Sequence, residues 1–113
     1  SEDKKFDLIF SHGVITHVED IDGFLRKCLK LTKNYLYISS GKGYHPEIIN
    51  HNQIWSEPDS CYYNELSVKR LEKIMAEENI EKEQYRIRAQ KSGSNEKGSG
   101  VQVIIEVSKN LKK

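Results

Sequence analysis

Residues 6–13 read Phe-Asp-Leu-Ile-Phe-Ser-His-Gly, and residues 35–40 read Tyr-Leu-Tyr-Ile-Ser-Ser. Both segments are mainly apolar and predict strands, at 6–11 and 35–39, the first buried on both faces of a parallel sheet. Between them, apolar residues recur at steps of three and four, which indicates an amphipathic helix ending near Asn34; they are Ile21, Phe24, Leu25, Cys28 and Leu29. Strand, helix and strand in this order predict two neighbouring parallel strands joined by a right-handed crossover.

The rest of the chain predicts a second crossover and a terminal hairpin. Residues 41–65 are rich in Gly, Pro, His, Asn and aromatic residues, and predict a long, irregular but ordered loop. Ser67 is a good N-cap for a second helix, whose apolar face would be Val68, Leu71, Ile74 and Met75. Strands are expected at 85–89 and 101–107, joined by the polar segment 91–100.

Together these elements predict an α/β fold with a mixed sheet of four strands, two of them parallel and two in a C-terminal antiparallel hairpin. The expected spatial order is 6–11, 35–39, 101–107, 85–89, with both helices on one face.

Composition and charge argue against nucleic acid, membranes and metal ions as partners of this chain. The chain has 113 residues, enough for one domain, and a net charge of +1, which gives no drive toward nucleic acid or an anionic membrane. Cys28 and Cys61 lack metal-type spacing, and His45 and His51 have no matching ligand pattern, so no metal site is expected. No apolar run suits a membrane span or a signal peptide, so the expected location is cytoplasmic.

The stretch from Phe6 to Asp20 resembles the middle of a class I S-adenosylmethionine (SAM) dependent methyltransferase. The family pattern is Phe-Asp and two hydrophobic residues, a small polar residue, further hydrophobic residues, then His, a hydrophobic residue and an acidic one. The resemblance implies half of a Rossmann-like methyltransferase fold. Residues 1–113 would then be a single domain, the C-terminal half, without the N-terminal part that carries the glycine-rich SAM-binding turn.

The resemblance also implies roles for particular residues. Ser11, His12 and Gly13 match the segment that lines the methionine end of SAM. His17 matches a frequent family histidine, and it is either a general base or a structural residue that holds the turn by a backbone hydrogen bond. The long loop is expected to supply the walls of an acceptor site, and the candidates are Tyr44, His45, Trp55, Tyr62 and Tyr63. The alternative is that the aromatic residues of this loop simply cover the end of the sheet. The cluster Glu19-Asp20-x-Asp22 is better explained by helix capping, through Asp20 or Asp22, than by metal or acid–base chemistry.

Two functions follow as hypotheses. The first is a fragment of a SAM-dependent methyltransferase for a small-molecule acceptor, inactive alone, with SAM bound by the complete parent and weakly or not at all by this chain. The second is a non-enzymatic binding or assembly module built on half of the fold. In either case the strand at 6–11 would be an open edge and the sheet face opposite the helices would lack a cover. The exposed side chains would be some of Phe6, Leu8, Phe10, Leu36 and Ile38, or their alternating neighbours, and a homodimer is expected.

Overall fold

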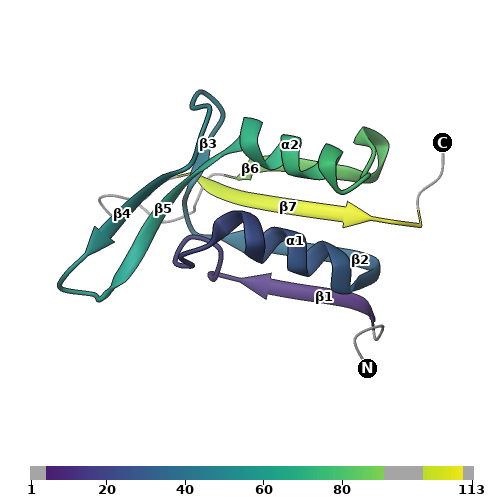
Figure 1. The fold of residues 1–113 in the computed structure, drawn as a ribbon, viewed down its shortest axis with the longest axis horizontal. Coiled ribbons are helices and arrows are strands. Elements are labelled where there is room, and N and C mark those ends of the chain that lie inside the picture. Colours follow the sequence, from purple (N-terminus) through teal and green to yellow (C-terminus); the bar gives the residue numbers. More distant parts are fainter. Residues whose placement is uncertain (1–4, 91–100, 111–113) are drawn as a thin grey trace.

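The main sheet has four strands and carries both helices on one face (Figure 1). The computed structural model describes residues 5–90 and 101–110. The strands are β1 (Phe6–His12), β2 (Thr32–Ser40), β6 (Tyr85–Gln90) and β7 (Gln102–Ser108), in the spatial order β1-β2-β7-β6. β1 is parallel to β2, and β7 is antiparallel to both β2 and β6. The predicted strand order is therefore confirmed, whereas the predicted connection at 91–100 lies outside the described residues.

The two helices begin at the expected caps. In α1 (Ile21–Leu31), the Asp20 side chain accepts a hydrogen bond from the Gly23 backbone N–H. In α2 (Val68–Glu77), Ser67 accepts one from the Arg70 backbone N–H. α1 ends earlier than predicted, because Thr32 is already extended and starts β2. A short 3-10 helix, η1 (Lys82–Gln84), leads into β6.

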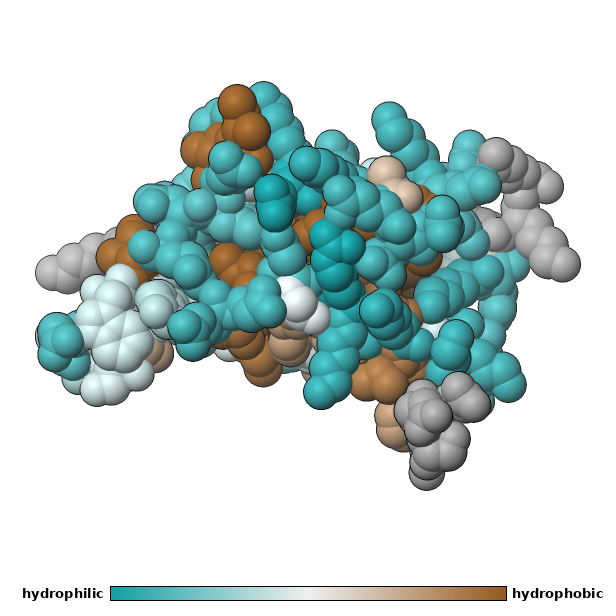
Figure 2. Space-filling model, viewed as in Figure 1, coloured by the Kyte–Doolittle hydropathy of each residue, from teal (hydrophilic) through white to brown (hydrophobic). Residues whose placement is uncertain are grey.

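The core lies between the helices and the sheet. It is formed by apolar side chains that are at most a few per cent exposed, among them Leu25, Leu29, Leu36, Ile38, Leu71, Met75, Val103, Ile105 and Val107. Arg26 of α1 also donates hydrogen bonds to Glu77 and Glu78 at the end of α2. The helix-bearing side of the molecule presents mainly hydrophilic side chains to solvent (Figure 2). The apolar helix faces read from the sequence are therefore the buried ones.

The segment 41–65 differs from the irregular loop that was predicted. It contributes a second, three-stranded sheet of β3 (Tyr44–His45), β4 (Asn52–Ser56) and β5 (Cys61–Ser67), in the order β3-β5-β4. β4 and β5 form a hairpin whose turn, residues 57–60, contains Pro58 and Asp59. Proline and aspartate favour such a turn, so this signal between two short β-favouring runs was present in the sequence.

The prediction that the first strand is buried on both faces is wrong: β1 is the edge strand, and its side chains on the face opposite the helices are exposed. Phe6, Leu8 and Phe10 are 48%, 60% and 65% exposed. Their side chains lie on the face opposite the helices, as expected for half of the fold, and the Phe10 ring stacks on Tyr37 at 5.3 Å. Leu36 and Ile38, by contrast, are fully buried on the helix face, because side chains alternate along a strand.

Candidate functional site

The carboxyl ends of β1 and β2 lie side by side, where open α/β sheets usually bind ligands. His12 is paired with Ser39 in the sheet register, and its Nδ1 lies 2.7 Å from the Ser39 hydroxyl. Gly13 donates its backbone N–H to the Ser39 carbonyl at 2.8 Å and has φ of +77°, a left-handed conformation that suits glycine. A Cβ at Gly13 would meet no atom within 4 Å, so the space beside this turn is open. The predicted SAM-contacting residues Ser11, His12 and Gly13 are thus adjacent at a strand end.

His17 lies in the loop between β1 and α1 and contacts β5. Its Nδ1 is 2.8 Å from the Tyr62 carbonyl oxygen, which can only accept, so Nδ1 carries a proton, and the neutral form of this ring has its lone pair on Nε2. The Cys61 sulfur lies 3.8 Å from the same nitrogen, and the Tyr63 ring packs edge-on at 5.2 Å. This arrangement contains the backbone hydrogen bond of the structural interpretation, and it also leaves Nε2 available as a proton acceptor.

The predicted acceptor-binding residues do not form one wall. His45 and Tyr63 line a cavity of about 280 Å³, together with Thr16, Lys42, Gly43, Ile54, Asn64 and Glu65. Trp55 and Tyr62 instead pair edge-to-face at 5.1 Å, on the other side of the β4–β5 hairpin, because neighbouring residues of a strand point to opposite faces. Tyr44 packs against the hydrophobic core. The lining residues Thr16, Lys42, Ile54 and Glu65 were missed, since only the hairpin and its register bring them together.

Tyr63 is held at the edge of this cavity by Asp59. Its hydroxyl donates to Asp59 Oδ2 at 2.5 Å, and this hydrogen bond raises the pKa of Tyr63 to about 12. The ammonium group of Lys42 lies 5.1 Å from the centre of the Tyr63 ring, in cation–π range. Tyr63 is therefore a neutral phenol with an oriented ring.

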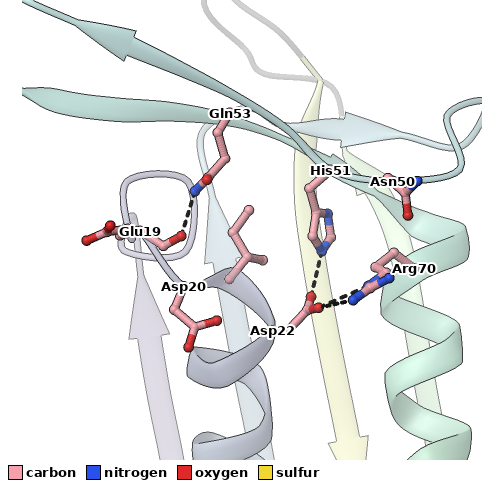
Figure 3. Close-up of a pocket in the computed structure, with 8 residues that line it drawn as sticks. Glu19, Asp20, Asp22, Asn50, His51, Gln53 and Arg70 are labelled. Carbon is pink, nitrogen blue, oxygen red and sulfur yellow. Dashed lines mark hydrogen bonds and ion pairs between the residues drawn. The ribbon is translucent and has the colours of Figure 1, made fainter.

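A second cavity, of about 300 Å³, lies beside Asp22 and was not predicted (Figure 3). His51 accepts the Ser67 backbone N–H at Nδ1 (3.0 Å), so its Nε2–H donates to Asp22 Oδ1 at 3.1 Å. Arg70 donates to the other Asp22 oxygen through Nε at 3.0 Å and Nη2 at 2.5 Å. Asp20 caps α1 as expected, whereas Asp22 joins the starts of α1 and α2 through His51 and Arg70. We call this group the Asp22–His51–Arg70 cluster.

Opposing effects set the ionisation of this cluster. Burial raises the pKa of Asp22, but the hydrogen bonds and charge of Arg70, with a smaller contribution from His51, outweigh burial and lower it below 3.8. Burial lowers the pKa of His51 below 6.5, and this outweighs the opposite effect of the Asp22 carboxylate. Both ring nitrogens of neutral His51 are already used in hydrogen bonds, so the cluster is suited to holding the fold rather than to exchanging protons.

Residues 5–90 and 101–110 contain no group of three or more His, Cys, Asp or Glu side chains arranged to hold a metal ion. In that same part of the chain, none of the helices has the length and apolar character needed to cross a membrane.

The first third of the chain is similar to a known protein family. Residues 1–38 match the family model described as a methyltransferase domain, and the match covers β1, the His17 loop, α1 and most of β2. No curated protein matches the chain. The matched segment contains Ser11, His12, Gly13 and His17. This segment of the chain is therefore similar to a methyltransferase domain.

Proposed function

We propose that this chain is the C-terminal half of a SAM-dependent methyltransferase that acts on a small-molecule acceptor, and that the chain alone is inactive. The observation that carries the proposal is the open edge of β1. This strand lies inside the methyltransferase match, yet residues 5–90 and 101–110 provide no neighbouring strand on one of its sides, and Phe6, Leu8 and Phe10 are about half or more exposed. An apolar edge of this kind fits a strand that joins the remainder of a larger sheet.

The residues at the strand ends fit only one end of SAM. The open space beside Gly13 and the backbone groups of the β1–α1 turn suit the methionine portion. Among the described residues, neither crossover opens with a glycine-rich turn between a strand and a helix, the arrangement that holds the rest of such a ligand. The remaining contacts are therefore assigned to the other half of the parent enzyme.

When bound, SAM supplies an electrophilic methyl group on a sulfonium. In the complete enzyme this methyl group would pass to a nucleophilic atom of the acceptor, and the sulfonium would become a neutral thioether. The proton of the acceptor is lost in the same process, and His17 Nε2 is the group we assign to receive it. The hydrogen bond from Nδ1 to Tyr62 keeps that tautomer in place.

The test is a calorimetric titration with SAM of two proteins: this chain, and the same chain preceded by whatever sequence its gene encodes upstream of Ser1. We expect no measurable binding to the first and micromolar binding to the second. In the longer protein, Gly13→Val should weaken binding, because valine is strained at φ of +77°. Gly41→Ala is the matched control, since a Cβ there also meets open space and no left-handed φ is required. Micromolar binding by the short chain would overturn the proposal.

A non-enzymatic assembly module is the competing function, and the same open β1 edge favours it. The upstream sequence separates the two. A strand followed by a glycine-rich turn supports the methyltransferase. A longer protein that folds but binds no SAM would support the module instead.

A further inference from the structure

The cavity between the β2–β3 connection and the β4–β5 hairpin has features of a small-ligand site. Its volume is about 280 Å³, and six side chains give it its chemistry: Thr16, Lys42, His45, Ile54, Tyr63 and Glu65. This volume is near the lower end of the pockets that hold drug-sized molecules, about 300 Å³ and above, so the ligand must be small. The cavity also adjoins the carboxyl end of β2, since Thr16 bonds to Ser40 at 2.8 Å.

The backbone around this cavity is closely packed on one side. Gly43 has φ of +115°, and a Cβ there would lie 2.8 Å from the Thr16 methyl group. The Asn64 side chain donates to the carbonyls of Ile15 and Val18, which holds the His17 loop against β5. The cavity therefore has walls that are fixed by the fold on the side nearest the strand ends.

The charged groups of the cavity are not equivalent. Glu65 accepts a hydrogen bond from Asn52 at 2.9 Å and lies 4.0 Å from His45 Nε2, so its charge is already engaged. In the described part of the chain, Lys42 has no carboxylate within ion-pair distance, and its ammonium group lies over the face of the Tyr63 ring. A ligand anion would therefore be drawn to Lys42 and away from Glu65.

Apolar surface accompanies this cation. Ile54 is 46% exposed on β4, directly opposite Tyr63 on β5. An apolar side chain beside an oriented, neutral phenol ring suits a flat apolar body, which can stack on Tyr63 and contact Ile54. The carboxylate of such a body would then meet the Lys42 ammonium.

We propose that this cavity binds a small aromatic carboxylate, held by Lys42 at its charged end and by Tyr63 and Ile54 along its ring. The inference rests on the proposed function, because it names the class of methyl acceptor. The binding itself is independent of SAM and can be tested without it.

The test is an NMR titration of the full chain with two probes of nearly equal shape, benzoate and its neutral analogue benzamide. We expect benzoate to shift the backbone amides of residues 42–43, 54 and 63, and to bind about two- to fivefold more tightly than benzamide, the range of an exposed ion pair. Lys42→Met should abolish that preference. Lys27→Met on α1 is the matched control and should leave it unchanged.

A further variant tests the ring contact. Ile54→Ala removes an exposed side chain, so folding should persist, and both probes should bind more weakly while benzoate keeps its advantage. Equal binding of the two probes to the wild-type chain, or shifts confined to other residues, would overturn the inference even if a lysine variant failed to fold. Such a result with normal SAM binding by the longer protein would leave the proposed function intact. Benzoate selectivity without SAM binding by the longer protein would support the carboxylate site and overturn the proposed function.

Discussion

At the scale of single residues, the two ring nitrogens of His17 have separate roles. Its Nδ1–H holds the loop to the Tyr62 carbonyl, and its Nε2 is the proposed base. In the complete parent enzyme, we expect His17→Ala to lower turnover by about 10²- to 10⁴-fold, the usual contribution of a general base. The loss of one exposed hydrogen bond should cost only about 1 kcal/mol of stability.

His17→Asn provides the control for this prediction. The asparagine amide can still donate to the Tyr62 carbonyl but offers no basic nitrogen. Steady-state kinetics and thermal melting of both variants decide between the interpretations. If asparagine restores turnover as well as stability, His17 is a structural residue.

His51 differs from His17 because both of its nitrogens are engaged and its side chain is largely buried. His51→Ala would leave the Ser67 N–H without its acceptor and remove one partner of Asp22. We expect the free energy of unfolding in urea to fall by about 1–3 kcal/mol, the cost of a buried unsatisfied polar group. His45→Ala, at a histidine whose hydrogen bond is to the exposed Glu47 carboxylate, should change it much less. Equal effects of the two substitutions would contradict this role.

At the scale of elements, the Asp22–His51–Arg70 cluster joins the starts of α1 and α2 to the segment before β4, and this makes the junction sensitive to pH. Burial lowers the pKa of His51 below its ordinary 6.5, so the unfolded chain takes up the proton more readily than the folded one. The stability contributed by neutral His51 is therefore complete above about pH 6.5 and is lost as pH falls through the folded pKa.

Urea unfolding measured at about pH 7.5 and about pH 5.5 tests this linkage. The wild-type midpoint should fall over this interval, and His51→Ala should show a smaller fall. The pKa of Asp22 is lowered from 3.8, so its contribution is lost only at more acidic pH and does not overlap. An identical pH dependence in the two proteins would exclude His51 as the source.

At the scale of the whole molecule, the helices cover one face of the main sheet, whereas the edge strand β1 exposes apolar side chains on the other face. The helices cover Leu36, Ile38 and the β7 residues Val103, Ile105 and Val107, whereas Phe6, Leu8, Phe10 and Tyr35 remain exposed on the opposite face. If two copies of β1 pair antiparallel about Ile9, Leu8 of each copy lies beside Phe10 of the other, and all four side chains share one face. The gain is about 25 cal/mol per Å² of apolar area buried, less the cost of association.

We therefore expect the purified chain to form a dimer at micromolar concentration in sedimentation experiments. Leu8→Lys should make it monomeric, because charge on an edge strand opposes pairing. Ile49→Lys is the control, since Ile49 is even more exposed but lies far from β1 in the sequence and outside the main sheet. A wild-type chain that stays monomeric would argue against pairing through β1, and also against the proposal that the chain is half of a larger methyltransferase.

The features that could be read from the sequence are those with local causes. Both helices were predicted from apolar spacing, as at Leu25 and Leu29, and from the caps Asp20 and Ser67. The order of the four strands was predicted from the crossovers and the terminal hairpin. The hairpin within 41–65 was missed, although its turn residues were visible, because each strand is short and mixes polar with aromatic residues. The site was predicted in part: His12 and Gly13 do lie at adjacent strand ends, whereas the aromatic residues divide between two faces.

The sequence by itself thus determined the kind, order and capping of the main elements, because hydrophobic period and capping act over a few residues. Only the tertiary structure decided that Asp22 reaches Arg70 across 48 positions, and that Lys42 and Ile54 share a cavity. These outcomes depend on which distant segments pack together. That choice is set by the summed burial of the whole chain, and no single stretch of residues encodes it.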